Sequence, residues 1–346
     1  MSEAPNDIVT AAIDAVASGR DLTAEQASIV LAEIMSDAVS EVQIAGFLIA
    51  LRTKGETAEE LAGLARTMRA RATAVDVGER KLLDTAGTGG GTRTFNVSTT
   101  AALIAAGAGC TVAKHGNRSA TGPSGSADLL EALGARIELD AADVARCIEQ
   151  TGFGFMFAPA HHHATRSVAP VRRALAVRTI FNFLGPLTNP AGARHQLIGV
   201  SDARYLETIA GALVQLGVER ALVVAGEDSL DEVSTNAPTR VFEVNGEQIT
   251  SYTIEPRDLG IEPSDGVAVA AGGTPEQNAA LTRAVLAGEG GPARDLALAN
   301  AGAAIYAAKA AASLREAVAL AGEAVDKGRA SETLERFIAA THEGAR

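Results

Sequence analysis

The glycine-rich segment from Asp84 to Gly91 places the tightest constraint on how this chain folds. It follows the apolar residues Leu82 and Leu83, and a helix-like run over 98–108 and a strand-like run over 111–114 come after it. A strand, a glycine-rich turn, a helix and a second strand are typical of a βαβ unit with two parallel strands. The segment therefore predicts a parallel sheet whose ligands collect at the carboxyl ends of the strands.

The rest of the chain continues this alternation. Further β-type runs cover 153–158, 196–200 and 221–224, and helical segments cover 140–150 and 203–216. Asn245-Gly246 lies between alternating segments within 240–254 and predicts a hairpin with a type I′ turn, and 275–340 is again helical. We therefore expect an α/β domain over 76–346 with a mostly parallel central sheet covered by helices.

The first 75 residues instead predict a small all-helical N-terminal domain. Three helix starts carry the Ser/Thr-x-x-Glu/Gln capping pattern, at Thr23–Gln26, Ser40–Gln43 and Thr57–Glu60. A helically spaced apolar set predicts a buried stripe, which serves either internal packing or a subunit interface: Val42, Ala45, Leu48, Ile49 and Leu51.

Charge and cysteine content narrow the class of protein. Thirty Lys and Arg against 42 Asp and Glu give a formal net charge of -12, which argues against a basic nucleic-acid surface. The two cysteines, Cys110 and Cys147, match no disulfide or metal-ligand spacing. Residues 1–11 do not resemble a signal peptide, and the apolar run 101–108 is too short to span a membrane. We expect a cytoplasmic protein.

The glycine-rich segment also predicts chemistry. Gly87, Gly89 and Gly90 after a strand allow backbone N–H groups to approach an anion, and Ser98 and Thr99 open a helix whose dipole favours negative charge. Thr92 occupies the third glycine position of the dinucleotide pattern, and no Gly-Lys-Ser/Thr follows to form a Walker loop. Two interpretations remain open at this point, a phosphate cradle and a tight turn.

Two more polar segments follow predicted strands. Lys114 begins the segment Lys-His-Gly-Asn-Arg118, where it can neutralise a phosphate or belong to a solvated basic loop. Asp231 and Glu232 follow the strand that ends at Val224, and they are either surface carboxylates or ligands for Mg²⁺, which binds one or two carboxylates together with substrate phosphates.

The run of histidines at 161–163 is a weaker candidate for a metal site than the Asp231–Glu232 pair. The first and third side chains of an extended segment share a face while the second points away, and no cysteine or carboxylate stands nearby. These histidines are expected to line a pocket or belong to a solvated loop.

Taken in order, the motifs GTGG, NVST, KHGNRS, SGSADLLEALG, RTIFNFLGPLTNPA and LDEVS resemble the anthranilate phosphoribosyltransferase family. The segment from Phe181 to Pro190 is typical of the wider nucleoside phosphorylase and phosphoribosyltransferase fold group. The similarity extends to about residue 340 and implies that a helical part of about 168–190 joins the domain of residues 1–75 in space. It also implies transfer of phosphoribosyl from phosphoribosyl diphosphate to the amine of anthranilate in tryptophan biosynthesis, with Mg²⁺, by a homodimer.

The resemblance also assigns roles to residues. Lys114, Asp231 and Glu232 are the expected catalytic residues, and Ser98 joins the two carboxylates as a metal ligand. The expected substrate-binding residues are Gly87, Thr88, Gly89, Gly90, Thr94, Asn96, Val97, Ser98, Thr99, Lys114, His115, Gly116, Asn117, Ser126, His162, Arg172 and Pro186. Among these, Asn117 and Arg172 are expected to contact anthranilate, because a guanidinium pairs bidentately with a carboxylate.

The chain departs from the family pattern at two positions. Gly91 stands where the family usually has Asp, as if that residue were deleted, and Pro123 stands where a Lys or Arg is expected before Ser-Gly-Ser-Ala-Asp. The first departure bears on the number of metal ions and the second on one phosphate-facing charge. Two alternative functions are a pyrimidine nucleoside phosphorylase-like enzyme, disfavoured by Arg172 and by the paired carboxylates, and a noncatalytic nucleic-acid-binding relative, disfavoured by the acidic balance.

Overall fold

A sheet of seven strands forms the centre of the computed structural model, which describes residues 4–119, 122–263 and 271–343. The strands lie in the order β3 (Phe153–Phe157), β2 (Thr111–Gly116), β1 (Leu82–Gly87), β4 (His195–Gly199), β5 (Arg220–Gly226), β6 (Thr239–Asn245) and β7 (Gln248–Ile254). The first five are parallel, and β6 and β7 form an antiparallel edge. The strand order reverses between β1 and β4, where sheets of this kind form a ligand crevice.

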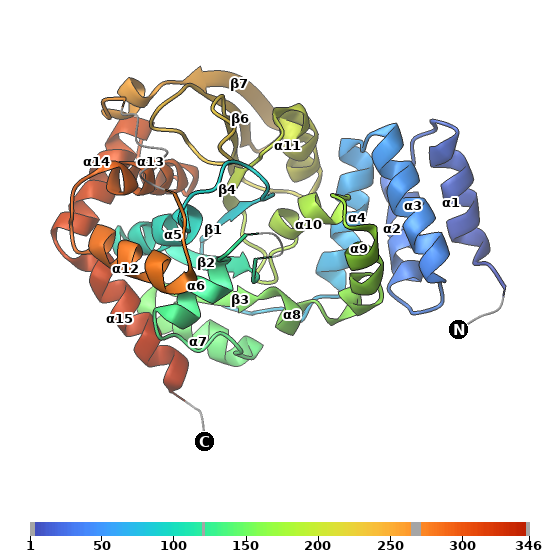
Figure 1. Ribbon diagram of the computed structural model, residues 1–346, viewed down its shortest axis with the longest axis horizontal. Helices are drawn as coiled ribbons and strands as arrows, with labels where there is room; N and C mark the ends of the chain where they lie inside the picture. The colour runs from blue at the N-terminus through green and yellow to red at the C-terminus, as the bar shows by residue number, and fades with distance from the viewer. Residues whose placement is uncertain (1–3, 120–121, 264–270, 344–346) are drawn as a thin grey trace.

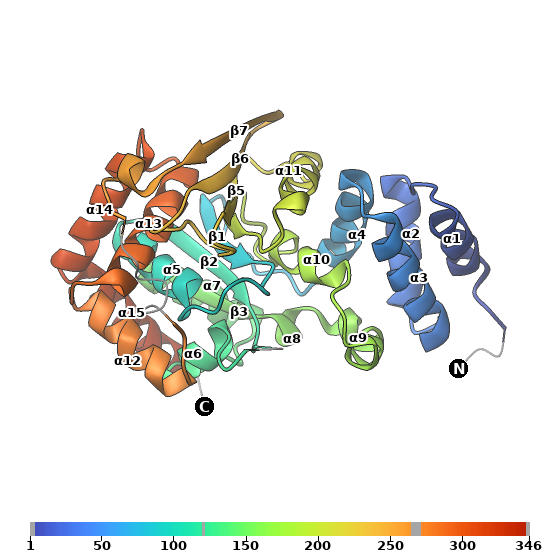
Figure 2. The same ribbon diagram turned by 45° about the horizontal axis from the view of Figure 1, so that its top comes forward.

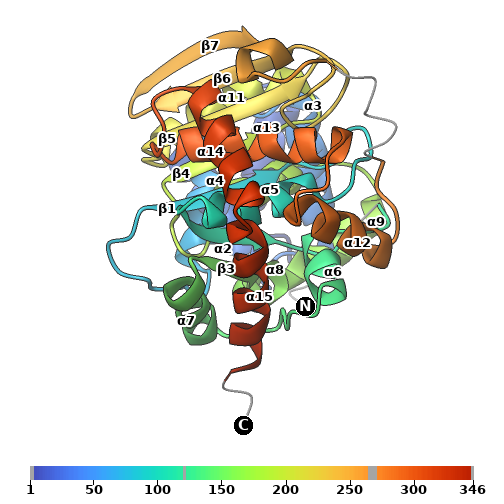
Figure 3. The same cartoon turned by 90° about the vertical axis from the view of Figure 1, so that its left-hand side faces the viewer.

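The two faces of the sheet belong to two hydrophobic cores. Leu197, Leu222 and Val224 face one core, while Ile198 and Val223 face the other, because successive side chains of a strand point to opposite faces. The first core also holds α5 (Val97–Gly107), α6 (Ser126–Ala132), α7 (Ala141–Thr151), α12 (Pro275–Leu286), α13 (Pro292–Ala307), α14 (Leu314–Asp326) and α15 (Arg329–His342) (Figures 1 and 3). The predicted α/β class is confirmed.

The second core joins the other sheet face to the helical part of the chain. It contains residues of α1 (Asp7–Ala17), α2 (Ala24–Ile34), α3 (Glu41–Lys54), α4 (Ala58–Ala70), α9 (Ala169–Leu175), α10 (Phe181–Leu187) and α11 (Leu206–Gln215). Figures 1 and 2 show α10 between the sheet and α4, and it packs against α4, β1 and β2. Short helical turns complete the chain: α8 (Ala158–His161), η1 (His163–Ser167), η2 (Ala203–Tyr205) and η3 (Pro256–Leu259). None of the helices described is long and apolar enough to cross a membrane.

The predicted helix starts are confirmed, with one change. Thr23 and Thr57 form reciprocal capping boxes at the starts of α2 and α4. Ser40 caps α3, but the Gln43 side chain does not return to the Ser40 backbone. Its amide instead accepts from Asn6 N at 3.1 Å and donates to Asn6 O at 3.0 Å, which ties α3 to the start of α1.

The predicted buried stripe on α3 is wrong in part. The buried face consists of Ile44, Phe47, Leu48 and Leu51, whereas the Val42 side chain is 81% exposed and Ile49 is 37% exposed. Positions 44, 48 and 51 share one side of a 3.6-residue helix, and positions 42, 45 and 49 share another. Within the second set, Val42 and Ile49 form an outward apolar face, while Ala45 is partly buried against the core.

The hairpin is present, but its predicted type I′ turn is wrong. Asn245 pairs with Gln248, so the two loop residues are Gly246 and Glu247. Gly246 has a φ of 62°, and Glu247 is not among the residues with positive φ. A type I′ turn requires positive φ at both central positions, whereas glycine at the first position alone is the pattern of a type II′ turn.

Candidate active site

The Lys114 side chain crosses from β2 to β1 and the start of α5. Its Nζ donates to the Thr85 carbonyl and lies 3.2 Å from Thr85 Oγ1 and 3.4 Å from Ser98 Oγ. The residue is only 2% exposed, and this burial lowers the pKa of Lys114 to about 8, against the opposing attraction of Asp84 and Glu232. Lys114 is therefore a buried cation at neutral pH, at the point where three elements meet.

Asp84 holds the strands around this lysine, and the sequence reasoning did not select it. Its carboxylate accepts from His115 N at 3.1 Å and from Asn189 Nδ2 at 2.8 Å, and Asn189 also donates to Ala113 O. Burial raises the pKa of Asp84, while Lys114 and these hydrogen bonds act against the rise. Its place just before the glycine run, and that of Asn189 within the LTNPA motif, are signals that would have found both.

The first turn of α5 has no side-chain cap. Asn96 occupies the N-cap position, but its side chain donates to Ser124 O at 3.1 Å and accepts from Ser124 Oγ and Asn278 Nδ2. Helix N-termini present N–H groups that require a partner and favour anions. Asn96 thus joins two loops and leaves the helix start suited to a phosphate group.

Asp231 lies inside the curve of the glycine-rich segment. Its carboxylate accepts from the Gly89 backbone N–H, and a Cβ at Gly87 would stand 3.3 Å from Asp231 Oδ2. The segment is fixed on its other side by Thr88 N, which donates to Gly199 O, and by Ser201 Oγ, which donates to Gly89 O. A Cβ at Gly87 would therefore be in tight contact with the Asp231 carboxylate, and glycine at this position leaves room for it.

Glu232 stands next to Asp231 and close enough to Lys114 to affect its charge. Burial first, and then the neighbouring Asp231 carboxylate, raise the pKa of Glu232 well above its usual value, while Lys114 opposes the rise. Burial also raises the pKa of Asp231. Mg²⁺ prefers oxygen ligands, and a divalent cation would favour the ionised form of two adjacent carboxylates whose ionisation burial disfavours.

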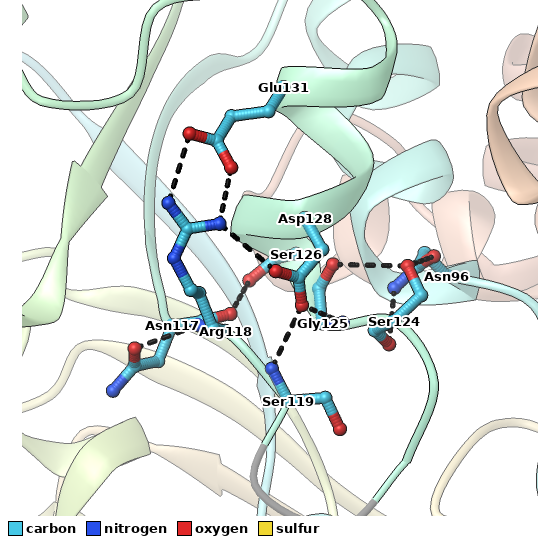
Figure 4. Close-up of polar contacts among 9 residues, drawn as sticks. All are labelled: Asn96, Asn117, Arg118, Ser119, Ser124, Gly125, Ser126, Asp128 and Glu131. Atoms are coloured by element: carbon cyan, nitrogen blue, oxygen red, sulfur yellow. Dashed lines mark hydrogen bonds and ion pairs between the residues drawn. The ribbon is translucent and has the colours of Figure 1, made fainter. Parts of the chain in front are cut away.

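The loop after β2 is organised by Asp128 at the start of α6 (Figure 4). The Asp128 carboxylate accepts from Gly125 N at 2.8 Å, Ser119 N at 3.0 Å and Arg118 Nη1 at 3.1 Å. Burial raises the pKa of Asp128, but these donors outweigh it and hold the pKa below its usual range. Arg118 also pairs with Glu131, so the guanidinium of this arginine is already engaged by two carboxylates.

The same loop positions Asn117 and Ser126. Asn117 Oδ1 accepts from Arg118 N at 2.7 Å, and its carbonyl accepts from Ser126 Oγ at 3.3 Å. Gly116 lies against Ser126, where a Cβ would stand 2.2 Å from Ser126 Oγ. Asn117 is an exposed residue.

His115 and His162 form a buried pair with ring centroids 5.0 Å apart. His115 Nδ1 lies 3.2 Å from Gly185 O, and the Nε2 atoms of both rings lack a hydrogen-bond partner among the residues described. Burial lowers the pKa of His115 to about 3 and that of His162 to about 4. Both imidazoles are therefore neutral at physiological pH and able to line a path for an aromatic ring.

The neighbouring histidines do not form the extended segment that we expected. His161 ends α8 and is buried with Nδ1 3.2 Å from Thr73 O, whereas His163 begins η1 and is exposed. The Pro at the start of α8 favours a helical first turn over an extended strand. No group of three His, Cys, Asp or Glu side chains suited to a metal occurs in the described part of the chain.

The remaining predicted residues lie around these groups. Arg172 is on α9 with its guanidinium 5.4 Å from the centre of the Phe181 ring, and no acidic partner lies within ion-pair distance in the ranges that the structure covers. Pro186 lies within α10, and its carbonyl accepts from Gln196 Nε2 at 2.8 Å. Val97 is a core side chain, Thr99 Oγ1 is buried without a partner among the residues described, and Thr94 is half-buried.

Sequence reasoning also missed Arg178. Its guanidinium donates to the carbonyl oxygens of Thr88, at 3.2 Å, and of Gly89. It contacts the predicted phosphate loop from a distant segment of the chain, and only its place at the start of the RTIFNFLGPLTNPA motif pointed to it.

Comparisons with known proteins agree with this geometry. Two family descriptions match the chain: "Glycosyl transferase family, helical bundle domain" over residues 10–72, and "Glycosyl transferase family, a/b domain" over residues 79–331. A protein of Symbiobacterium thermophilum named anthranilate phosphoribosyltransferase is 49% identical over 328 residues, covering 94% of this chain and 96% of the relative.

Solved structures give the same result. The crystal structure of anthranilate phosphoribosyltransferase from Thermus thermophilus superposes with a TM-score of 0.90 at 46% identity, covering 95% of this chain and 99% of that one. The Saccharomyces cerevisiae enzyme, in complex with PRPP and Mg, gives a TM-score of 0.88 at 28% identity over 96% of this chain and 97% of its own.

Proposed function

The chain belongs to the anthranilate phosphoribosyltransferase family, and we propose that it transfers phosphoribosyl from phosphoribosyl diphosphate to the amine of anthranilate. The products are N-(5-phosphoribosyl)anthranilate and diphosphate. The observation that carries the assignment to these residues is the convergence of a buried Lys114, an uncapped α5 start and the Asp231–Glu232 pair on one edge of the sheet. Lys114 and the start of α5 favour binding of a polyanionic substrate, and the carboxylate pair favours binding of its cation.

The residues at this edge of the sheet must stabilise the diphosphate as it leaves. Positive charge develops on the ribose C1 and negative charge on the departing oxygen, so positioned cations and N–H groups lower the barrier. Lys114 supplies a positive charge held in place by Thr85 and Ser98, and the first turn of α5 supplies backbone donors. Asp231, Glu232 and Ser98 would hold Mg²⁺, which when bound neutralises diphosphate charge.

Anthranilate attacks through a neutral aromatic amine, so a strong general base is not required. Arg172 would pair with the ortho carboxylate, and the Asn117 amide would position the ring. His115 and His162 are neutral and buried, so their part is to line the path and exclude water. The gain from this arrangement is the alignment of amine and C1 before reaction.

The direct test is the loss of anthranilate fluorescence when phosphoribosyl diphosphate is added with Mg²⁺. We expect loss only when the enzyme, both substrates and the metal are present. A stable anthranilate signal, together with phosphate-dependent cleavage of a pyrimidine nucleoside, would assign the chain to the phosphorylase-like alternative instead.

The same proposal includes the setting in which the enzyme works. We place it in tryptophan biosynthesis in the cytoplasm, acting as two domains over 1–75, with part of 168–190, and 76–346. We propose a homodimer formed mainly by the helical part, supported by the outward face of Val42 and Ile49 on α3 and by exposed Ile8 on α1. Apolar side chains gathered on one exposed face are typical of interaction surfaces.

A further inference from the structure

A cavity opens beside the glycine-rich loop of the proposed substrate site, between the helical part and the sheet. Its volume is about 900 Å³, and it is lined from α3, from η2 and from the segments that follow β4 and β5. Of the residues proposed for substrate and metal, only Gly90 lines it. The cavity is large enough for a small molecule, and the proposed reaction assigns nothing to it.

Arginine side chains dominate its charge. Arg52, Arg178, Arg204 and Arg240 line the cavity, against the carboxylates of Glu56, Asp202 and Glu227. Arg204 is neutralised by Asp202 at 2.7 Å. Arg52 and Arg240, by contrast, have no carboxylate within ion-pair distance among the residues described, so their guanidinium groups are available to an anion.

Glu56 provides a second and independent feature. Its side chain is buried, with 7% of the residue exposed, and it lines the same cavity. Its Oε2 atom has no hydrogen-bond partner in the described part of the chain, although Tyr205 bonds to the carboxylate. Buried polar atoms in native proteins almost always have a partner, so this carboxylate oxygen, which is covered from solvent beside the cavity, calls for a donor that the described residues do not supply.

We propose that this cavity binds a small phosphate-bearing molecule that also carries a hydroxyl group. The phosphate lies among Arg52, Arg178 and Arg240, and the hydroxyl donates to the Glu56 carboxylate, whose side chain turns towards the cavity to bring Oε2 within reach. Phe183 and Tyr205, whose ring centroids are 4.2 Å apart, form an apolar wall for the carbon skeleton between these groups. Sugar phosphates combine these features in one molecule.

Arg178 connects this cavity to the substrate site. The same guanidinium that faces the cavity donates to the carbonyls of Thr88 and Gly89 in the phosphate loop. A phosphate in the cavity competes with those carbonyls for the guanidinium and loosens the loop. Occupancy should therefore raise the KM for phosphoribosyl diphosphate.

Titration calorimetry with ribose 5-phosphate tests the site. The probe should bind wild type at two sites, and Arg52→Gln with Arg240→Gln should abolish one of them or weaken it at least roughly tenfold. Lys114→Gln is the reverse control, because it alters only the substrate site and should leave the cavity site intact. Both arginines in the double variant are exposed, so circular dichroism should show a native fold.

Two further probes separate the parts of the proposed ligand. Glu56→Gln should weaken ribose 5-phosphate but not inorganic phosphate, which has no sugar hydroxyl to offer. Unchanged ribose 5-phosphate binding and stoichiometry in the double arginine variant would overturn the proposal, as would loss of all binding in a folded Lys114→Gln protein. Should Lys114→Gln not fold, the stoichiometry of wild type against the double variant decides alone.

A kinetic measurement tests the connection through Arg178, and it rests on the proposed function, whereas calorimetry does not. A fixed concentration of ribose 5-phosphate should raise the KM for phosphoribosyl diphosphate more in wild type than in the double arginine variant. An equal rise in both proteins would overturn the connection. An inactive enzyme that still binds at the cavity would count against the proposed function and leave the site supported.

Discussion

Gly91 lies so close to Asp231 that a Cβ at position 91 would stand 2.5 Å from Asp231 Oδ1 and 2.9 Å from Asp231 N. At Gly91 a bare backbone therefore lies against the proposed metal carboxylate. The absence of a side chain at 91 is therefore a steric requirement of this chain.

Gly91→Ala tests that requirement. The added methyl group would displace Asp231 or the glycine-rich loop, so kcat/KM for phosphoribosyl diphosphate should fall roughly 10- to 100-fold at saturating Mg²⁺. Gly322→Ala on α14 is the matched control, because nothing lies within 4 Å of its Cβ position. Steady-state kinetics on both variants checks this, and wild-type rates in Gly91→Ala would show that the loop moves freely.

Asp231→Asn with Glu232→Gln separates catalysis from stability. Removing the proposed metal ligands should lower Mg²⁺-dependent turnover roughly 10²-fold or more. The pKa values of both acids are raised in the folded protein, so the stability present while they are protonated is lost as pH rises through those values. At neutral pH without Mg²⁺, the double variant should therefore melt at a higher temperature than wild type.

The melting temperatures also show whether a loss of activity comes from the metal site or from a damaged fold. Low activity in a protein that melts above wild type reports loss of the metal site, whereas low activity with early melting reports a damaged fold. Full activity in the double variant contradicts the metal assignment.

Local signals in the sequence predicted much of the fold. Capping pairs at Thr23 and Thr57 and the βαβ pattern around Asp84–Gly91 act over a few residues, and the structure confirms them. The wrong predictions concern features that depend on packing against, or pairing with, another segment of the chain. The face of α3 that becomes buried depends on α1, and the hairpin turn depends on the register that pairs Asn245 with Gln248.

The site residues likewise fall into those that a local motif marks and those that only the folded structure brings together. Loop motifs at the ends of β1, β2 and β5 were visible because each is a contiguous run that follows a strand. Asn278 was not, because it reaches Asn96 across 182 residues and no local pattern marks it. Arg178 likewise acts on backbone carbonyls, which no residue pattern marks, so only its place in the RTIFNFLGPLTNPA motif pointed to it.

The pH profile should report Lys114. Its pKa of about 8 means that the free enzyme loses this positive charge as pH rises through about 8, so kcat/KM for phosphoribosyl diphosphate should decline above that pH. In Lys114→Arg the charge persists to far higher pH, so its remaining activity should show no such decline. An identical decline in both proteins would assign the titration to another group.

The oligomeric state can be tested on the outward face of α3. Sedimentation of wild type at micromolar concentration should give a dimer, and Val42→Glu should give a monomer, since Val42 is 81% exposed and its substitution leaves the core intact. Ile249→Glu on β7 is the control, because Ile249 is 40% exposed on the edge strand far from the helical part (Figure 1). A wild-type monomer would refute the dimer.

The last prediction separates the two substrates through Arg172 and Lys114. Arg172 has no acidic partner among the described residues, so it is available to the anthranilate carboxylate, and a charge-assisted pair of this kind contributes on the order of 1.5 to 3 kcal/mol. Arg172→Ala should therefore raise the KM for anthranilate roughly 10- to 150-fold and leave that for phosphoribosyl diphosphate nearly unchanged. Lys114→Ala should do the opposite, lowering kcat and weakening phosphoribosyl diphosphate while sparing anthranilate. Both variants are to be measured at saturating Mg²⁺, so that occupancy of the proposed metal site at Asp231 does not limit either rate. If Arg172→Ala instead weakened phosphoribosyl diphosphate and spared anthranilate, the residue assignment would be wrong although the reaction stood.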